Sequence, residues 1–248
     1  MSGIKALVFS SLLLLLAIGV RGQDNWDLAL AQYRSGNYDA SIALWDSIAV
    51  EEPSAAVFFN LGNAWYEKGD IPRSVLYYEK ALLLDPGHRN TRENLEIARS
   101  YIEDPVPVIR SFFLARWWKA FTDILSPNGW AFLFLLAFSL FVAIWILYLF
   151  GKITKRIRNI GMLVFLLLTL ASGFSARSTF RHVIDHNRAV VLPRSVTLYT
   201  SPDEMSPVLR EFPGGTVVRI IDRLDDWLLV VLPNMEQGWV EASTLERI

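Results

Sequence analysis

Cysteine is absent from this 248-residue chain, and neither sign of charge is in clear excess. Without cysteine, the chain has no disulfide framework, no thiolate metal site and no cysteine nucleophile. The formal net charge of −1 gives no overall basic field, so we expect no nucleic-acid partner. The motifs of phosphate-binding loops, serine-hydrolase elbows, zinc proteases and dinucleotide-binding folds are also missing, so we expect no enzyme.

Histidine is scarce as well, with three residues in the chain. His182 and His186 are four positions apart, which would place both imidazoles on one helix face, but no convincing third ligand accompanies them. Asp222, Asp225 and Asp226 lack the regular spacing of a calcium loop and indicate a turn instead. We therefore expect neither a metal nor a cofactor.

Charge is nearly absent from residues 1–22, 129–150 and 160–176, where only Lys5 and Arg21 are charged. The first stretch has a short basic start and an apolar core too short to span a bilayer comfortably, which predicts a signal peptide. An uncleaved anchor is the alternative. In either case the segment that follows leaves the cytoplasm.

The other two stretches predict a transmembrane hairpin. As helices they would measure about 33 Å and about 25 Å against a hydrocarbon core of about 30 Å, and the shorter one can span if its flanking arginines snorkel. Residues 151–159 between them carry four basic residues and no acid, which favours a cytoplasmic loop. An exported N-terminus followed by one inward span gives the same topology. Both soluble ends then face outward, away from the cytoplasm.

A self-match with a period of 33 residues follows the predicted signal peptide: residues 35–38 recur as 68–71, and Pro53 recurs as Pro86. Each unit has the pattern of two amphipathic helices with a glycine-containing turn and a proline stop. Residues 90–101 are expected to form a solvating or third helix. The second unit resembles the tetratricopeptide (TPR) pattern at Phe58, Leu61, Gly62, Trp65, Gly69, Tyr78, Ala81 and Pro86.

The TPR resemblance implies a concave face that binds a partner. The residues that we assign to this face are Phe59, Asn60, Asn63 and Tyr66. Asn60 stands where TPR carboxylate clamps place an asparagine, but Trp26 and Leu30 stand where the first repeat would need Lys and Asn, so the clamp is incomplete. The alternative is that the asparagines only support helix packing and turns.

A connector follows the repeat, beginning at Pro105 and Pro107, which end the helical pattern. Residues 109–125 then interleave aromatic with basic side chains, a composition typical of a helix in the membrane interface. A helix packed under the repeat domain is the alternative.

After residue 188 the periodicity becomes that of short strands. The five apolar runs are 189–192, 196–199, 216–221, 227–232 and 238–240. Residues 196–202 and 213–216 resemble the opening strand and tight turn of bacterial SH3-like (SH3b) domains, and Trp227 and Trp239 match the two tryptophan signatures of these domains. The resemblance implies a small barrel that binds protein or peptidoglycan through these tryptophans. The alternative is that both pack in the core.

The predicted fold class is therefore multi-domain: an all-α TPR repeat, a transmembrane α-hairpin and a small all-β SH3-like barrel. The expected division is 1–22 signal peptide, 23–104 TPR repeat domain, 105–128 connector with an interfacial helix, 129–150 transmembrane helix 1, 151–159 cytoplasmic basic loop, 160–176 transmembrane helix 2, 177–188 juxtamembrane linker and 189–248 SH3-like domain.

This order, with the connector at 112–118 and the closing residues 245–248, resembles the BatE-type proteins of the aerotolerance operon over essentially the whole chain. The resemblance implies an inner-membrane component that works with sister Bat proteins bearing von Willebrand A domains and with a MoxR-type ATPase in the envelope stress response.

Three functions agree with these features. The first is a non-catalytic scaffold whose repeat groove and barrel both hold partner proteins. The second is a cell-wall sensor or anchor whose barrel binds peptidoglycan. The third is a periplasmic assembly or chaperone-like factor that uses the groove for many clients.

Overall fold

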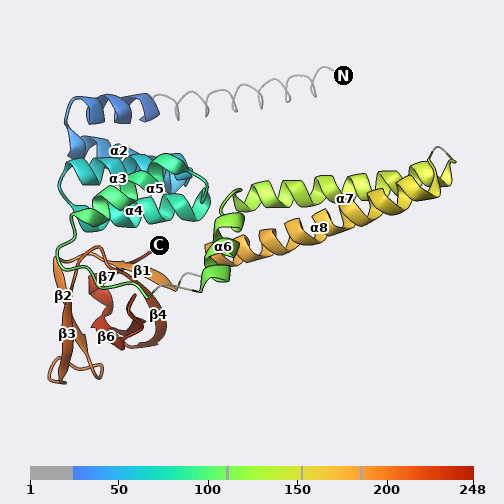
Figure 1. The fold of residues 1–248 in the computed structure, drawn as a ribbon. Helices are drawn as coiled ribbons and strands as arrows, with labels where there is room; N and C mark the ends of the chain where they lie inside the picture. Colours follow the sequence, from blue (N-terminus) through green and yellow to red (C-terminus); the bar gives the residue numbers. More distant parts are fainter. Residues whose placement is uncertain (1–24, 110–111, 152, 185–186) are drawn as a thin grey trace, which may run out of the picture.

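The computed structural model describes residues 25–109, 112–151, 153–184 and 187–248. The signal peptide predicted for residues 1–22 lies outside them. Figure 1 shows a helical repeat stacked on a sheet domain, with a long helical hairpin projecting to one side. A helical segment over residues 25–34 precedes the first complete helix. The helices of the repeat are α2 (Tyr38–Glu51), α3 (Ala55–Glu67), α4 (Ile71–Leu84) and α5 (Arg89–Ser100).

The helix boundaries of the repeat follow from local chemistry. Ser54 and Asp70 cap α3 and α4 by accepting hydrogen bonds from backbone N–H groups of the first turn, at 3.3 and 3.0 Å. Gly36 and Gly69 occupy the corresponding turns of the two units with φ of +79° and +83°, a conformation that favours glycine. The period seen in the sequence is thus a repeat of turns, as predicted.

The repeat has a continuous apolar interior in which Trp45 is fully buried and meets the ring of Trp26 edge-on at 4.6 Å. Gly62 permits the close approach of α3 and α4, because a Cβ there would lie 2.5 Å from ring carbons of Tyr78. α5 covers the second repeat with Leu95 and Ala98, which are both buried. The predicted third helix is confirmed.

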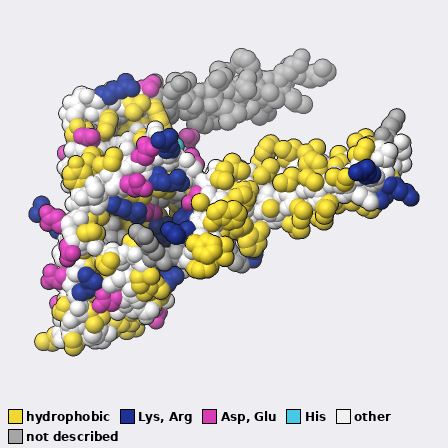
Figure 2. Space-filling view, in the orientation of Figure 1, with side chains coloured by type: hydrophobic (Ala, Val, Ile, Leu, Met, Phe, Trp, Pro, Cys, Tyr) yellow, Lys and Arg dark blue, Asp and Glu magenta, His cyan; other side chains and the backbone are white. Residues whose placement is uncertain are grey.

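The connector contains α6 (Phe113–Thr122), which lies across the base of the hairpin (Figure 1). The hairpin consists of α7 (Pro127–Leu149) and α8 (Lys155–Ile184), both long and apolar enough to cross a membrane. On the face drawn in Figure 2 hydrophobic side chains cover much of the hairpin and charged ones are concentrated at its far tip, where they are basic. α8 is longer than the predicted span of 160–176, and most of the segment predicted as a juxtamembrane linker, 177–188, is helical, because no glycine or proline follows Ala176 in this segment to end the helix.

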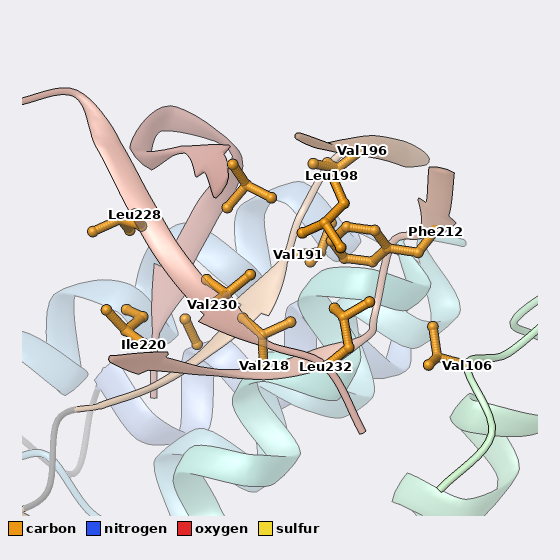
Figure 3. Packing of buried hydrophobic residues seen from close by; sticks show 12 residues of the cluster. Val106, Val191, Val196, Leu198, Phe212, Val218, Ile220, Leu228, Val230 and Leu232 are labelled. Carbon is orange, nitrogen blue, oxygen red and sulfur yellow. The ribbon is translucent and has the colours of Figure 1, made fainter. Parts of the chain in front are cut away.

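The C-terminal domain (residues 187–248) is an antiparallel sheet with the strand order β3-β2-β6-β5-β4-β1-β7. Its inward-facing side chains form one apolar core, which Figure 3 shows with Val106 of the connector at its edge. Val106 is buried in this core, and the backbone N–H of Ile109 donates to the carbonyl of Pro233 at 3.2 Å. The strands are β1 (Arg188–Val191), β2 (Ser195–Tyr199), β3 (Val208–Pro213), β4 (Val217–Leu224), β5 (Trp227–Val231), β6 (Gln237–Glu241) and β7 (Leu245–Arg247).

The five predicted strands are present, but the sheet has two more, β3 and β7. β3 pairs only with β2 and leaves most of its residues at least partly exposed, so it lacks the alternating apolar pattern by which strands are recognised. β7 has three residues and is held by β1 alone. A strand at the edge of a sheet pairs with only one neighbouring strand and is more exposed, so its sequence shows the apolar strand pattern less clearly.

The helical repeat and the sheet domain share a core. Val190 of β1 is fully buried in one apolar cluster with Leu76 and Leu95, and Ile102 packs against the same cluster. Gly215, in the turn before β4, lies so close that a Cβ there would come within 2.8 Å of Ile102. The two domains therefore form one compact unit rather than two modules on a flexible tether.

Candidate partner-binding site

A groove of about 260 Å³ opens on the helical repeat between α3, α4 and α5. Its lining residues are Tyr33, Asn63, Tyr66, Glu67, Tyr78, Asn94 and Ile97. The groove therefore combines aromatic rings, side-chain amides and one carboxylate, a composition suited to hydrogen bonding an extended polypeptide.

The floor of the groove is a hydrogen-bond network centred on Asn63. Its carbonyl oxygen accepts from the Tyr78 hydroxyl at 2.7 Å and from the Asn94 amide at 2.9 Å. Burial raises the pKa of Tyr78 to about 12, so this hydroxyl is a donor at neutral pH. The network fixes the orientation of the amides before any ligand arrives, which lowers the entropy cost of binding.

The rim of the groove is aromatic and apolar. Ile97 is 49% exposed although it is a large hydrophobic residue, and the rings of Tyr66 and Tyr101 meet edge-on at 5.9 Å. Burial, together with the charge of Glu67, raises the pKa of the Tyr33 hydroxyl. The rim thus presents tyrosine hydroxyls and an isoleucine to solvent around the polar floor.

Of the four predicted groove residues, the structure places two in the groove and two beside it. Asn63 and Tyr66 line it. Phe59 packs on Tyr78 and meets the ring of His88 edge-on at 5.2 Å, so it supports the helices. The Asn60 amide donates to the carbonyl of Ala56 in its own helix at 2.9 Å.

Asn94, Glu67 and Ile97 were not anticipated as groove residues. Asn94 and Ile97 lie on α5, which the sequence predicts as a helix without indicating the face it turns to the repeat. One signal was available, since Asn94 and Ile97 are three positions apart and so share a helix face. Glu67 is the last residue of α3 and follows Tyr66 directly.

The two tryptophans of the sheet domain are both half-buried, and neither belongs to the apolar core. Trp227 meets the ring of Tyr199 edge-on at 5.5 Å, and Trp239 is paired with Tyr199 across β2 and β6. Trp227 also lines a cleft of about 400 Å³ whose other walls include Glu204, Asp226 and Glu241. An indole face beside three carboxylates is suited to a ligand that carries both apolar surface and amino groups.

A second cleft, of about 590 Å³, lies between the connector and the sheet domain. Its walls are largely apolar and include Val106, Val217 and Leu232, and arginines including Arg99 and Arg188 stand at its edge. The sequence could not indicate it, because its two walls come from segments that are at least 80 residues apart. Among the described residues, no group of three or more His, Cys, Asp or Glu side chains is placed to hold a metal ion.

Two family models match parts of the chain. A tetratricopeptide repeat model matches residues 55–88, which are α3, α4 and the turn after them. A bacterial SH3 domain model matches residues 194–246, which are β2 to β7. No curated protein matches the chain significantly. The chain thus joins a tetratricopeptide repeat to a bacterial SH3 domain in one structure that also carries two candidate membrane-spanning helices.

Proposed function

We propose that this protein is a non-catalytic scaffold of the bacterial inner membrane, which holds partner proteins on the periplasmic side through its repeat groove and its SH3 domain. The observation that carries the proposal is the shared core around Val190 and Leu76. Because the two domains form one unit, a partner complex that touches both gains avidity without a loop-closure cost.

The membrane placement rests on the hairpin. α7 and α8 expose apolar side chains such as Phe132 and Leu170 over most of their length. Monomeric soluble proteins rarely expose an apolar surface of this extent to water. The repeat and the sheet domain both lie at the same end of this hairpin (Figure 1). Lys155, Arg156 and Arg158 stand near the other end, which by the positive-inside rule is the cytoplasmic one.

The partners that we favour are those implied by the BatE-type resemblance, namely membrane proteins with von Willebrand A domains and, through them, a MoxR-type ATPase. Support for this assignment comes from the order of the domains along the chain, and the matched repeat and SH3 models agree with that order.

The test is chemical crosslinking of the full-length protein in its native membrane, followed by identification of the captured proteins. A groove variant, Glu67→Lys with Ile97→Asp, changes two exposed rim residues and leaves the hydrogen-bonded floor intact. A matched control, Glu51→Lys with Leu28→Asp, makes the same change of charge and replaces one aliphatic residue by Asp, at exposed positions outside the groove. The proposal expects a short list of von Willebrand A proteins that the groove variant loses and the control keeps. Equal capture by both variants would show that the groove does not bind these partners.

A second candidate function, peptidoglycan binding, is favoured by the cleft beside Trp227, because cell-wall peptides carry free amino groups and sugars stack on indole rings. It predicts that the full-length protein in detergent pellets with purified sacculi and that Trp227→Ala abolishes pelleting.

A long list of unrelated proteins in the crosslinking experiment would instead favour the chaperone-like use of the groove.

A further inference from the structure

A basic pocket of about 450 Å³ lies where the helical repeat meets α6. One wall is formed by Gly87, in the turn between α4 and α5, and by Arg92 in the first turn of α5, and the other is α6 with Arg116 and Lys119. The contact between the walls is close, because a Cβ on Gly87 would lie 3.3 Å from the carbonyl oxygen of Ile124. The pocket is thus built by two elements that are distant in sequence.

The pocket has an excess of positive charge. Its basic side chains are Arg92, Arg116 and Lys119, and its one carboxylate is Asp123, which pairs with Lys119 at 3.0 Å. Arg92 donates to the backbone carbonyl of Pro86, which is a neutral acceptor and does not neutralise the charge of Arg92. Arg116 forms no ion pair with any residue that the structure describes. Two of the three positive charges are therefore not neutralised within the pocket.

α6 is amphipathic, and its aromatic face determines how deep the pocket would lie relative to a bilayer. Arg116, Lys119 and Asp123 share one face, at spacings of three and four. The adjoining face carries Phe113 and Trp117, which are 58% and 68% exposed. Aromatic residues of this kind settle at the boundary between headgroups and acyl chains.

α6 is also fixed to the hairpin. The Trp130 indole N–H on α7 donates to the carbonyl of Thr122 at 2.9 Å in a buried bond, and Trp118 packs against Phe174 of α8 with ring centroids 5.4 Å apart. The basic pocket therefore lies beside the base of the hairpin, at the level where lipid headgroups begin if α7 and α8 cross the membrane.

We propose that this pocket binds the phosphate of an anionic phospholipid headgroup. The arginine guanidinium is suited to phosphate because its planar fork donates two parallel hydrogen bonds. A lipid bound there would touch the repeat through Arg92 and α6, which packs on the hairpin, through Arg116, and so would fix the unit of repeat and SH3 domain at one angle to the bilayer. The inference rests on the membrane placement in the proposed function.

The test measures lipid retention by the full-length protein in detergent, using native mass spectrometry with added phosphatidylglycerol or phosphatidylcholine. Arg92→Gln with Arg116→Gln should weaken retention of phosphatidylglycerol about 25-fold, since each basic residue near an anionic surface contributes about fivefold. Retention of phosphatidylcholine should not change. Arg89→Gln with Arg194→Gln removes the same charge at exposed positions outside the pocket and should retain phosphatidylglycerol as the wild type does. Arg92→Lys with Arg116→Lys should give an intermediate value.

Millimolar inorganic phosphate identifies the source of the anion. The proposal expects phosphate not to displace the lipid, because the acyl chains beside Trp117 supply part of the affinity; displacement would make the pocket a general anion site and overturn it. Equal retention by the double Gln variant and the wild type would also overturn it. Flotation with phosphatidylcholine vesicles tests the membrane placement separately. If the chain floats but shows no preference for phosphatidylglycerol in the mass spectrometry, the lipid pocket alone is refuted. A chain that does not float refutes both.

Discussion

The carboxylate of Glu79 on α4 accepts a hydrogen bond from the guanidinium of Arg188 on β1 at 2.6 Å, across 109 positions of the chain. The other oxygen of the same carboxylate accepts from Arg99 on α5. Glu79 is 7% exposed, so one nearly buried carboxylate joins both helices to the first strand of the SH3 domain. This bridge lies at the edge of the apolar cluster that contains Val190.

Glu79→Gln should loosen this junction. The substitution keeps the volume but removes the charge that balances two arginines, and we expect a loss of about 2 kcal/mol, below the full cost of breaking a buried pair because both arginines reach solvent. Hydrogen exchange of the full chain in detergent should rise in both α4 and β1. The control is Lys80→Gln, which removes the more exposed pair with Glu246 and should cost less than about 1 kcal/mol. Faster exchange in β1 alone would contradict a shared junction.

Gly215→Ala and Gly36→Ala form a second, matched test of the domain contact. Both glycines have φ close to +80°, so each alanine should cost about 1 kcal/mol of backbone strain. A Cβ at position 36 meets nothing within 4 Å, whereas one at position 215 would lie 2.8 Å from the Cδ1 of Ile102. We expect Gly215→Ala to cost a further 1 to 2 kcal/mol, roughly, through overpacking.

The same test has an internal check. In an Ile102→Ala background the extra cost of Gly215→Ala should disappear, and the coupling energy from the double-mutant cycle then measures the contact between the repeat and the SH3 domain. The readout is denaturant unfolding of the full chain followed by tryptophan fluorescence. Additive effects would mean that Ile102 and the turn do not press on each other in solution.

The sequence was sufficient for the features that depend on local patterns. Gly69 indicates the turn inside the second helix pair, Pro86 indicates the end of that pair, and Trp227 and Trp239 indicate two strands, because turn geometry and side-chain alternation depend on only a few neighbouring residues. Glu79 and the edge strand β3 carried no such signal, and Asn94 carried only its spacing of three from Ile97. A glutamate or asparagine on an amphipathic helix has the same local pattern whether it faces solvent or a second domain, so its role depends on packing that only the three-dimensional structure contains.

The stability of the repeat should fall in alkaline solution through Tyr78. Burial raises the pKa of this hydroxyl to about 12 in the folded chain, against about 10 in the unfolded one. Below pH 10 both states keep the proton and stability is unaffected. As the pH rises from about 10 to about 12 the unfolded state loses its proton first, so the free energy of unfolding decreases.

Tyr78→Phe should reduce this decrease while costing about 1 kcal/mol at neutral pH, since the hydrogen bond to Asn63 is lost. Thermal unfolding of the full chain between pH 8 and pH 12 provides the measurement. Tyr199→Phe, which removes one hydroxyl from the SH3 domain, serves as the control. An unchanged alkaline slope in Tyr78→Phe would show that other tyrosines carry the effect.

The absence of cysteine makes the membrane topology directly measurable with single cysteines. Val50 on the repeat and Met205 on the SH3 domain are 86% and 93% exposed, and Thr154 is exposed between α7 and α8. Each can be replaced by cysteine in the full chain without disturbing the core. A membrane-impermeant maleimide added to spheroplasts should label Val50→Cys and Met205→Cys, whereas Thr154→Cys should react only after the membrane is opened. Labelling of all three before opening would mean that the hairpin does not cross, because the basic tip around Arg158 would then lie on the same side as both domains.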